Sequence, residues 1–176
     1  FFILDAQLAS GRETPLIVAG PKGVEARALA LMEMLFPGSA TASRRFDLRF
    51  VEISPGAPVD LLGLRVEAFP MVHDERAGPC QGYRLSEGGK TFAFSGDTGW
   101  CDGLPDLARG ADVALLECYL AGGKPVAAHL DAATLIARRA ELTARRLFVT
   151  HMSAAMLAAG APAPGERAYD GLVIDI

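Results

Sequence analysis

Apolar and polar residues follow one another along the chain in patterns that predict a mixed α/β fold. Between residues 24 and 36, apolar side chains recur at helical spacing with charged residues between them, and Pro37-Gly38 then ends the helix. Three shorter apolar runs have the length of buried strands, at residues 16–19, 113–118 and 147–150. Further helical segments are predicted at residues 105–109, 131–142 and 153–159, the second of them capped by Asp131.

Alternation of apolar and polar residues predicts antiparallel strands in the first half of the chain. Residues 46–53 and 61–69 alternate in this way on either side of a Pro-Gly-Ala-Pro turn, so we expect them to pair with each other. Residues 82–85 and 91–94 flank Glu87-Gly88-Gly89-Lys90, which is typical of a hairpin. A loop is expected at 161–164 and a closing strand at 172–176.

Residues that can carry chemistry follow the ends of the predicted strands. The apolar run that ends at Phe94 leads into Asp97, which lies between Gly96 and Gly99, while Glu117 and His151 end later runs. The chain has three histidines, at positions 73, 129 and 151. Because open α/β sheets place their ligand sites at the carboxyl ends of strands, a shared sheet edge would bring together the residues at predicted strand ends: His73, Asp97, Glu117 and His151. Taken singly, Asp97 could instead cap a turn and each histidine could be an ordinary loop residue.

The donor types limit the chemistry of such a site. Imidazole and carboxylate ligands without a thiolate suit zinc, manganese or iron in a hydrolytic centre. A carboxylate such as Asp97 can bridge two ions, which then act together on the attacking and leaving oxygens of a phosphoryl transfer. For Glu117 and His129, a surface ion pair is the simpler alternative.

Composition narrows the class of protein. The chain has 176 residues, 51% of them hydrophobic, which is enough for one domain with a substantial core. Its net charge of -4 argues against a general nucleic-acid binder, which normally carries a basic face. No apolar run is long enough to cross a bilayer. Three cysteines without a Cys-x-x-Cys spacing fit a reducing compartment, so a cytoplasmic location is expected.

Several short motifs occur along the chain: Phe94-Ser95-Gly96-Asp97-Thr98, Val149-Thr150-His151-Met152-Ser153, His73 upstream of Gly82-Tyr83-Arg84, Gly20-Pro21-Lys22-Gly23, Leu116-Glu117 and His129-Leu130. Together they resemble the motifs of the metallo-β-lactamase fold superfamily, and in particular of its ribonuclease Z-like and phosphodiesterase-like branch. The resemblance covers nearly the whole chain. It implies an α/β fold, the C-terminal and larger part of an αββα sandwich with mixed sheets. The family's His-x-His-x-Asp-His motif is absent, and the chain begins at Phe1, so we expect a single domain over 1–176 that is truncated at its N-terminus.

The resemblance also implies a role for each candidate residue. His73 would bind the first metal ion, His151 the second, and Asp97 both. The ions would be two zinc ions (Zn²⁺), with Mn²⁺ or Fe as alternatives. His129 would act as proton donor or transition-state stabiliser near the scissile phosphate, and Glu117 would orient it, as a carboxylate can orient an imidazole for acid catalysis.

The implied activity is metal-dependent hydrolysis of phosphodiester bonds through a metal-bridging hydroxide at a dinuclear centre. Without the missing motif, this chain alone is expected to be an inactive fragment. The expected substrate is a small-molecule or nucleotide-type phosphodiester. Ribonuclease Z carries a long tRNA-gripping arm where this chain has only the short segment 83–94, so tRNA is an unlikely substrate. No membrane partner is expected, and the apolar start of the chain favours association, for example as a homodimer.

Two other readings of the sequence stay open. The chain could be a non-catalytic binding module derived from the same fold. It could also be a doubly wound phosphoryl-transfer domain with Asp97 as nucleophile, although that gives the histidines no role and conflicts with the antiparallel first half. Sulfur-ester, lactone and amide hydrolysis are further reactions of the same fold, because a fold does not fix a reaction.

Overall fold

The structure is a computed structural model that describes residues 1–122, 126–158 and 164–176. Its internal contacts divide the chain into two compact units, Phe1–Ile53 and Ser54–Ile176, and each is described by itself. The expectation of a single truncated domain over 1–176 stays a prediction. Among the described residues, no helix combines the length and apolar character that a membrane span requires.

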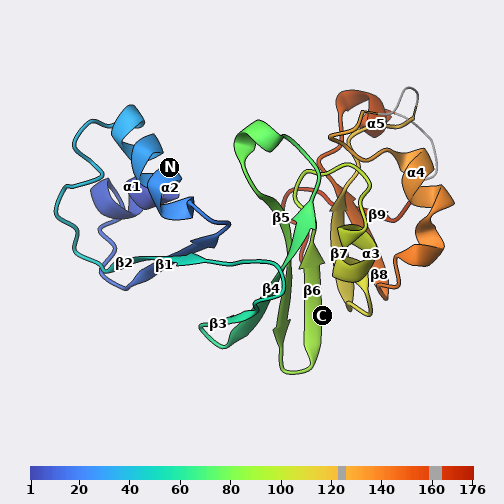
Figure 1. Cartoon of the computed structure of the whole chain (residues 1–176), viewed down its shortest axis with the longest axis horizontal. Helices are drawn as coiled ribbons and strands as arrows, with labels where there is room; N and C mark the ends of the chain where they lie inside the picture. The colour runs from blue at the N-terminus through green and yellow to red at the C-terminus, as the bar shows by residue number, and fades with distance from the viewer. Residues whose placement is uncertain (123–125, 159–163) are drawn as a thin grey trace. The chain divides into compact units, whose positions relative to one another are not determined.

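The first unit holds two helices and a two-stranded parallel sheet (Figure 1). Its elements are α1 (Phe2–Leu8), β1 (Leu16–Gly20), α2 (Val24–Leu35) and β2 (Leu48–Glu52). The predicted run at 16–19 and the helix from 24 are confirmed. Met32 of α2 is buried, as are Phe46 and Ile53 at the two ends of the β2 segment. The Gly20–Gly23 turn joins β1 to α2, and the Gly23 backbone N–H donates to Oε1 of Glu52 at 2.7 Å.

The predicted antiparallel pairing of 46–53 with 61–69 is wrong. Residues of β2 pair in parallel with β1, from Leu16 opposite Leu48 to Gly20 opposite Glu52. The helix α2 lies between these strands in sequence, as a parallel connection requires. Residues 61–69 belong to the second unit, where they take part in a hairpin of their own.

The second unit is organised on one seven-stranded mixed sheet with strand order β3-β4-β5-β6-β7-β8-β9. The strands are β3 (Val59–Leu61), β4 (Leu64–Met71), β5 (Cys80–Glu87), β6 (Lys90–Phe94), β7 (Val113–Glu117), β8 (Arg146–Thr150) and β9 (Glu166–Arg167). Strands β3 to β6 pair antiparallel, and β6 to β9 pair in parallel. The hairpin at 87–90 and the mixed α/β character are therefore confirmed.

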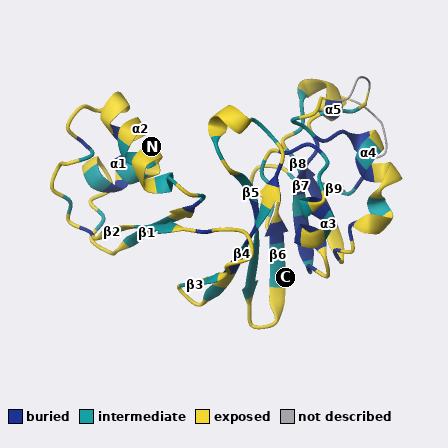
Figure 2. Ribbon diagram, viewed as in Figure 1, coloured by how far each residue is buried: buried dark blue, intermediate teal, exposed yellow. Residues whose placement is uncertain are grey.

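The helices of this unit are short: α3 (Gly103–Ala108), α4 (Ala132–Ala137), α5 (Ala154–Ala158) and the 3₁₀ turns η1 (Glu75–Ala77) and η2 (Arg139–Glu141). Helix α3 packs on β4, β5 and β6. Gly82 of β5 permits this approach, since a Cβ there would lie 3.0 Å from Leu107 of the helix. Buried residues concentrate along β7 and β8 (Figure 2). The best-packed part of the second unit is therefore the part of the sheet formed by β7 and β8, next to the carboxyl ends of these strands.

Two predictions in the second half differ from the structure, and a third falls largely outside the described residues. Asp131 caps α4 as expected, with its carboxylate accepting from the Thr134 N–H at 2.8 Å, but the helix ends at Ala137 and not near residue 142. Residues 172–176 form no strand, and the last strand of the sheet is β9, which pairs with β8. The expected loop at 161–164 and the end of the predicted 153–159 helix fall largely outside the described residues.

Candidate metal centre

The three parallel strands β6, β7 and β8 end at the same edge of the sheet. Their register pairs Phe94 with Leu115 and Glu117 with Thr150. Asp97 follows β6 by three residues, Glu117 is the last residue of β7, and His151 comes directly after β8. Parallel pairing therefore brings three candidate residues from distant parts of the sequence to one edge.

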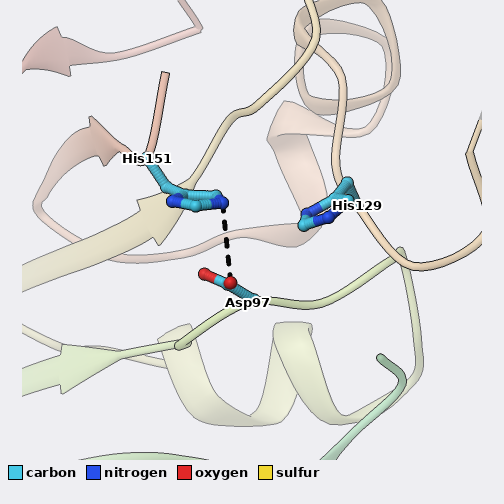
Figure 3. A group of neighbouring side chains, drawn as sticks. All are labelled: Asp97, His129 and His151. Carbon is cyan, nitrogen blue, oxygen red and sulfur yellow. Dashed lines mark ion pairs between the residues drawn. The ribbon is translucent and has the colours of Figure 1, made fainter. Parts of the chain in front are cut away.

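Asp97, His129 and His151 form a compact group of potential metal ligands. One ligand atom from each lies within 4.8 Å of the other two. Within the group, Nε2 of His151 lies 3.5 Å from Oδ2 of Asp97. Figure 3 shows the three side chains directed toward one another from three separate segments of chain. Asp97 and His151 are exposed, so the group is open to solvent.

His73 lies beside this group but is not part of it. Its ring meets the ring of His129 edge-on, with centroids 5.0 Å apart. Its Nδ1 lies 2.9 Å from the carbonyl oxygen of Ala128. Since a carbonyl only accepts, Nδ1 must carry the hydrogen, which leaves the Nε2 lone pair available to a metal.

Glu117 is almost fully buried, with 1% of its surface exposed, and its carboxylate is bonded to two loops. Its two oxygens lie 3.1 and 3.2 Å from Nδ1 of His129. They also accept from the backbone N–H groups of Leu130 and Thr98. The carboxylate therefore fixes the His129 ring through Nδ1, so that Nε2 is the nitrogen that can bind a metal or transfer a proton.

A close backbone approach sets the position of the Asp97 loop. The Gly99 N–H donates to the Val72 carbonyl at 2.7 Å, and the buried Thr98 hydroxyl accepts from the Val72 N–H at 3.1 Å. A Cβ on residue 99 would lie only 1.9 Å from the carbonyl oxygen of Ala127. Only glycine fits there, which explains why the Ser-Gly-Asp-Thr stretch is followed by this residue.

The backbone at His151 has an unusual conformation. Its φ is 54°, in the left-handed region, and among the described residues other than glycine only Leu62 shares a positive φ. Such a conformation costs an L-residue about 1–2 kcal/mol. Strain of this kind is characteristic of functional positions, where the surrounding structure holds the residue in place.

Sequence reasoning missed one residue of the site, Tyr119. Its ring packs against both His129 and His151, with centroid distances of 4.8 and 5.2 Å. A signal was available, since Tyr119 lies two residues after Glu117 and alternate residues of an extended segment face the same way. An aromatic residue just after a buried strand is, however, more typical of a core position.

A cavity of about 550 Å³ lies beside His73 in the second unit. Its lining includes Pro70, Met71, Val72, Pro79, Asp74 and Gln81. Arg76 donates side-chain and backbone hydrogen bonds to Asp74, and they hold the pKa of this carboxyl below its ordinary value. The cavity therefore combines an apolar wall with a negatively charged group at neutral pH.

Several known proteins resemble this chain in sequence or in fold. The chain is 27% identical to ribonuclease Z of Geobacillus kaustophilus, in an alignment that covers 86% of this chain and 64% of that protein. Its fold resembles that of Zn²⁺-bound PqqB from Methylobacterium extorquens, with a TM-score of 0.68, 16% identity, and coverage of 94% of this chain and 67% of that chain. It also resembles the short form of human tRNase Z, with a TM-score of 0.61, 21% identity, and coverage of 84% and 64%.

The mixed sheet, with histidine and carboxylate side chains at its strand ends, defines the class of fold, which is the metallo-β-lactamase fold. A family model described as beta-lactamase superfamily domain matches residues 6–152, and the chain belongs to this family. Within it, the relatives indicate the ribonuclease Z-like branch. The chain spans less than two thirds of the length of the ribonuclease Z relative.

Proposed function

We propose that this chain belongs to a metal-dependent hydrolase of phosphodiester bonds and carries much of its active centre. The observation that supports this most directly is the convergence of Asp97, His129 and His151 within 4.8 Å at the carboxyl edge of the sheet. Convergence of titratable groups from separate segments at such an edge is the usual form of an α/β active site.

The donor set fits divalent metal ions. Imidazole and carboxylate donors without thiolates suit zinc, with manganese or iron as alternatives. We propose that His73 and His151 each hold one of two ions and that Asp97 contacts both. When bound, such ions supply an activated water and neutralise the charge that develops on phosphate oxygens.

His129 and Glu117 have a different role in this proposal. The Glu117 carboxylate accepts from Nδ1 of His129, so a second proton on the ring resides on Nε2. Nε2 gives that proton to the leaving alkoxide oxygen as its bond to phosphorus breaks, and the ring returns to its neutral form. His129 lies close enough to Asp97 to be a ligand instead, and the variants below distinguish the two roles.

The proposed substrate is a small-molecule or nucleotide-type phosphodiester, not a tRNA. A cavity of about 550 Å³ beside His73 has the size of a small-molecule site. The β5–β6 hairpin turns on Gly88 and Gly89 and carries no arm. The net charge of -4 is also unfavourable for an extended polyanion. A homodimer stays a prediction, supported by the exposure of Phe1 and Phe2.

The test uses the longest available form of the protein, with metal content and hydrolysis of bis(p-nitrophenyl) phosphate as readouts. Asp97→Asn and His151→Ala should lose bound metal and activity together. His129→Ala should keep its metal and lose about 10²–10⁴-fold in turnover, as expected for removal of a general acid. Asp170→Asn, which changes an exposed carboxylate, is the matched control and should be unaffected.

Other outcomes of these experiments would contradict the assigned roles or the proposal. If His129→Ala lost metal and activity equally, His129 would be a ligand. Hydrolysis that needs no metal and survives Asp97→Asn would overturn the proposal. Stable metal binding without turnover of phosphodiesters, thioesters or lactones would favour the non-catalytic module.

Residues 1–176 alone should hold metal weakly and be inactive. Each ion would have Asp97 and one histidine, whereas catalytic zinc normally has three protein ligands. Purified chain should retain well under one zinc per molecule after dialysis. Two tightly bound zinc ions together with turnover would show that the ligand assignment is wrong.

A further inference from the structure

The ring of Tyr119 lies against two of the three side chains in the ligand group. Its centroid is 4.8 Å from that of His129 and 5.2 Å from that of His151, and the planes differ by 30° and 29°. The two imidazoles are themselves 5.5 Å apart and 28° from parallel. Each ring therefore packs on the other two, and Tyr119 contacts both histidines at once.

The backbone around Tyr119 is bonded to the loops that carry both histidines. The Tyr119 carbonyl accepts from the N–H of Ser153, two residues beyond His151. The next residue, Leu120, donates to the carbonyl of Leu130, and its own carbonyl accepts from Ala132. These bonds fix the segment after β7 between the two histidine loops, so the Tyr119 ring is held where it can set the separation of the imidazoles.

We propose that Tyr119 is a positioning residue of the metal centre, whose ring holds the imidazoles of His129 and His151 in the orientation that faces Asp97. The inference builds on the proposed function, because it assigns a role within the same centre. The aromatic face carries this role, since the contacts are between ring planes. Phenylalanine at position 119 should therefore keep this role, whereas leucine, which is apolar but has no aromatic ring, should not.

Proton NMR signals of the histidine rings in the metal-free chain test the contact between Tyr119 and the two imidazoles. The chain has three histidines, so the imidazole C–H resonances can be assigned by substitution. In Tyr119→Leu, the signals of His129 and His151 should move downfield and broaden as the ring current and the packing are lost, and those of His73 should move less. Tyr119→Phe should retain the wild-type positions. Tyr169→Leu is the matched control, because Tyr169 is 69% exposed.

Zinc titration of the longest available form of the protein tests whether Tyr119 affects the zinc affinity. Loss of a group that orients metal ligands typically costs 10–100-fold in affinity, so Tyr119→Leu should raise the zinc dissociation constant at least about tenfold. Tyr119→Phe should restore it to within about twofold of the wild type, a rescue that a role of the hydroxyl would not allow.

The two proposals fail differently. Unchanged His129 and His151 signals in Tyr119→Leu, or unchanged zinc affinity in that variant, would overturn the positioning role while the metal centre stands. Absence of zinc binding by the wild-type protein would overturn the metal centre, and the histidine signals would still decide whether Tyr119 orders the rings. Should Tyr119→Leu fail to fold, Tyr119→Thr takes its place with the same expectations.

Discussion

The Thr98 hydroxyl shows how single atoms support the candidate centre. The side chain is fully buried, and its oxygen accepts from the Val72 N–H and donates to a carbonyl. Thr98→Val keeps the shape but leaves these groups unpaired, so the free energy of unfolding should fall by about 1–3 kcal/mol. Urea unfolding measures this, with Thr98→Ser as the control that keeps the hydroxyl. Equal midpoints for the two variants would contradict the role of the hydrogen bonds.

Cys118 should make stability depend on pH. Burial, together with the nearby charges of Asp131 and Glu117, raises the pKa of the Cys118 thiol from 9.0 to about 11. Above about pH 9 the unfolded chain loses this proton while the folded chain keeps it, so the free energy of unfolding falls as pH rises toward 11. Below pH 9 the contribution is complete. Urea unfolding across this range should show a smaller decline for Cys118→Ala than for Cys80→Ala; identical declines would contradict this.

At the scale of elements, the turn between β3 and β4 carries a residue that does not suit it. Leu62 and Gly63 have φ values of 53° and 90°, the conformation of a two-residue turn that favours Asn-Gly. The Leu62 side chain is 87% exposed and contributes little burial. Leu62→Asn should therefore raise the free energy of unfolding by about 1 kcal/mol. Leu62→Val, which is β-branched, should have a melting temperature below that of the wild type. A lower melting temperature for Leu62→Asn than for Leu62→Val would rule this out.

Short sequence patterns are enough to identify some helices, strands and turns but not others. The apolar runs of β7 and β8 and the Gly88-Gly89 turn identify their elements, because burial and turn geometry act over a few neighbouring residues. The partner of 46–53 could not be identified, since alternation says that a strand has two unlike faces but not what lies beside it. Residues 172–176 have strand-like side chains, yet the place beside β8 belongs to β9.

The candidate site was predictable only in part, for the same reason. Residues at strand ends were recognisable one by one, but their convergence depends on the order of β6, β7 and β8, which no short pattern encodes. The structure groups Asp97 and His151 with His129, and it places His73 next to His129. The assigned metal-binding and acid roles of these four residues stay predictions.

At the scale of the whole molecule, the two units differ in how much they bury. The main cluster of packed hydrophobic residues lies entirely within Ser54–Ile176. Only five hydrophobic residues of Phe1–Ile53 are buried: Leu4, Ala6, Met32, Phe46 and Ile53. Local stability follows buried apolar contact, so the first unit should open more easily than the second.

Hydrogen exchange of the native chain measures this difference. Backbone amides of β1 and β2 should exchange at a lower free energy of opening than those of β7 and β8. Leu116→Ala, in the main cluster, should lower protection in the second unit by about 2–5 kcal/mol, and Met32→Ala should act within the first. Equal protection of both units in every variant would show that they unfold as one.

Because His151 has a left-handed backbone, a substitution that stabilises the chain at this position would remove a side chain that the proposed activity needs. A glycine at this position would relieve the strain and make the chain more stable, while removing one of the imidazoles on which the proposed chemistry depends. An engineering campaign that screens only for heat resistance would therefore enrich variants that have lost this side chain. Screens for robust forms of this protein should select for retained zinc affinity in the same round, so that thermal gains do not come from the loss of the centre.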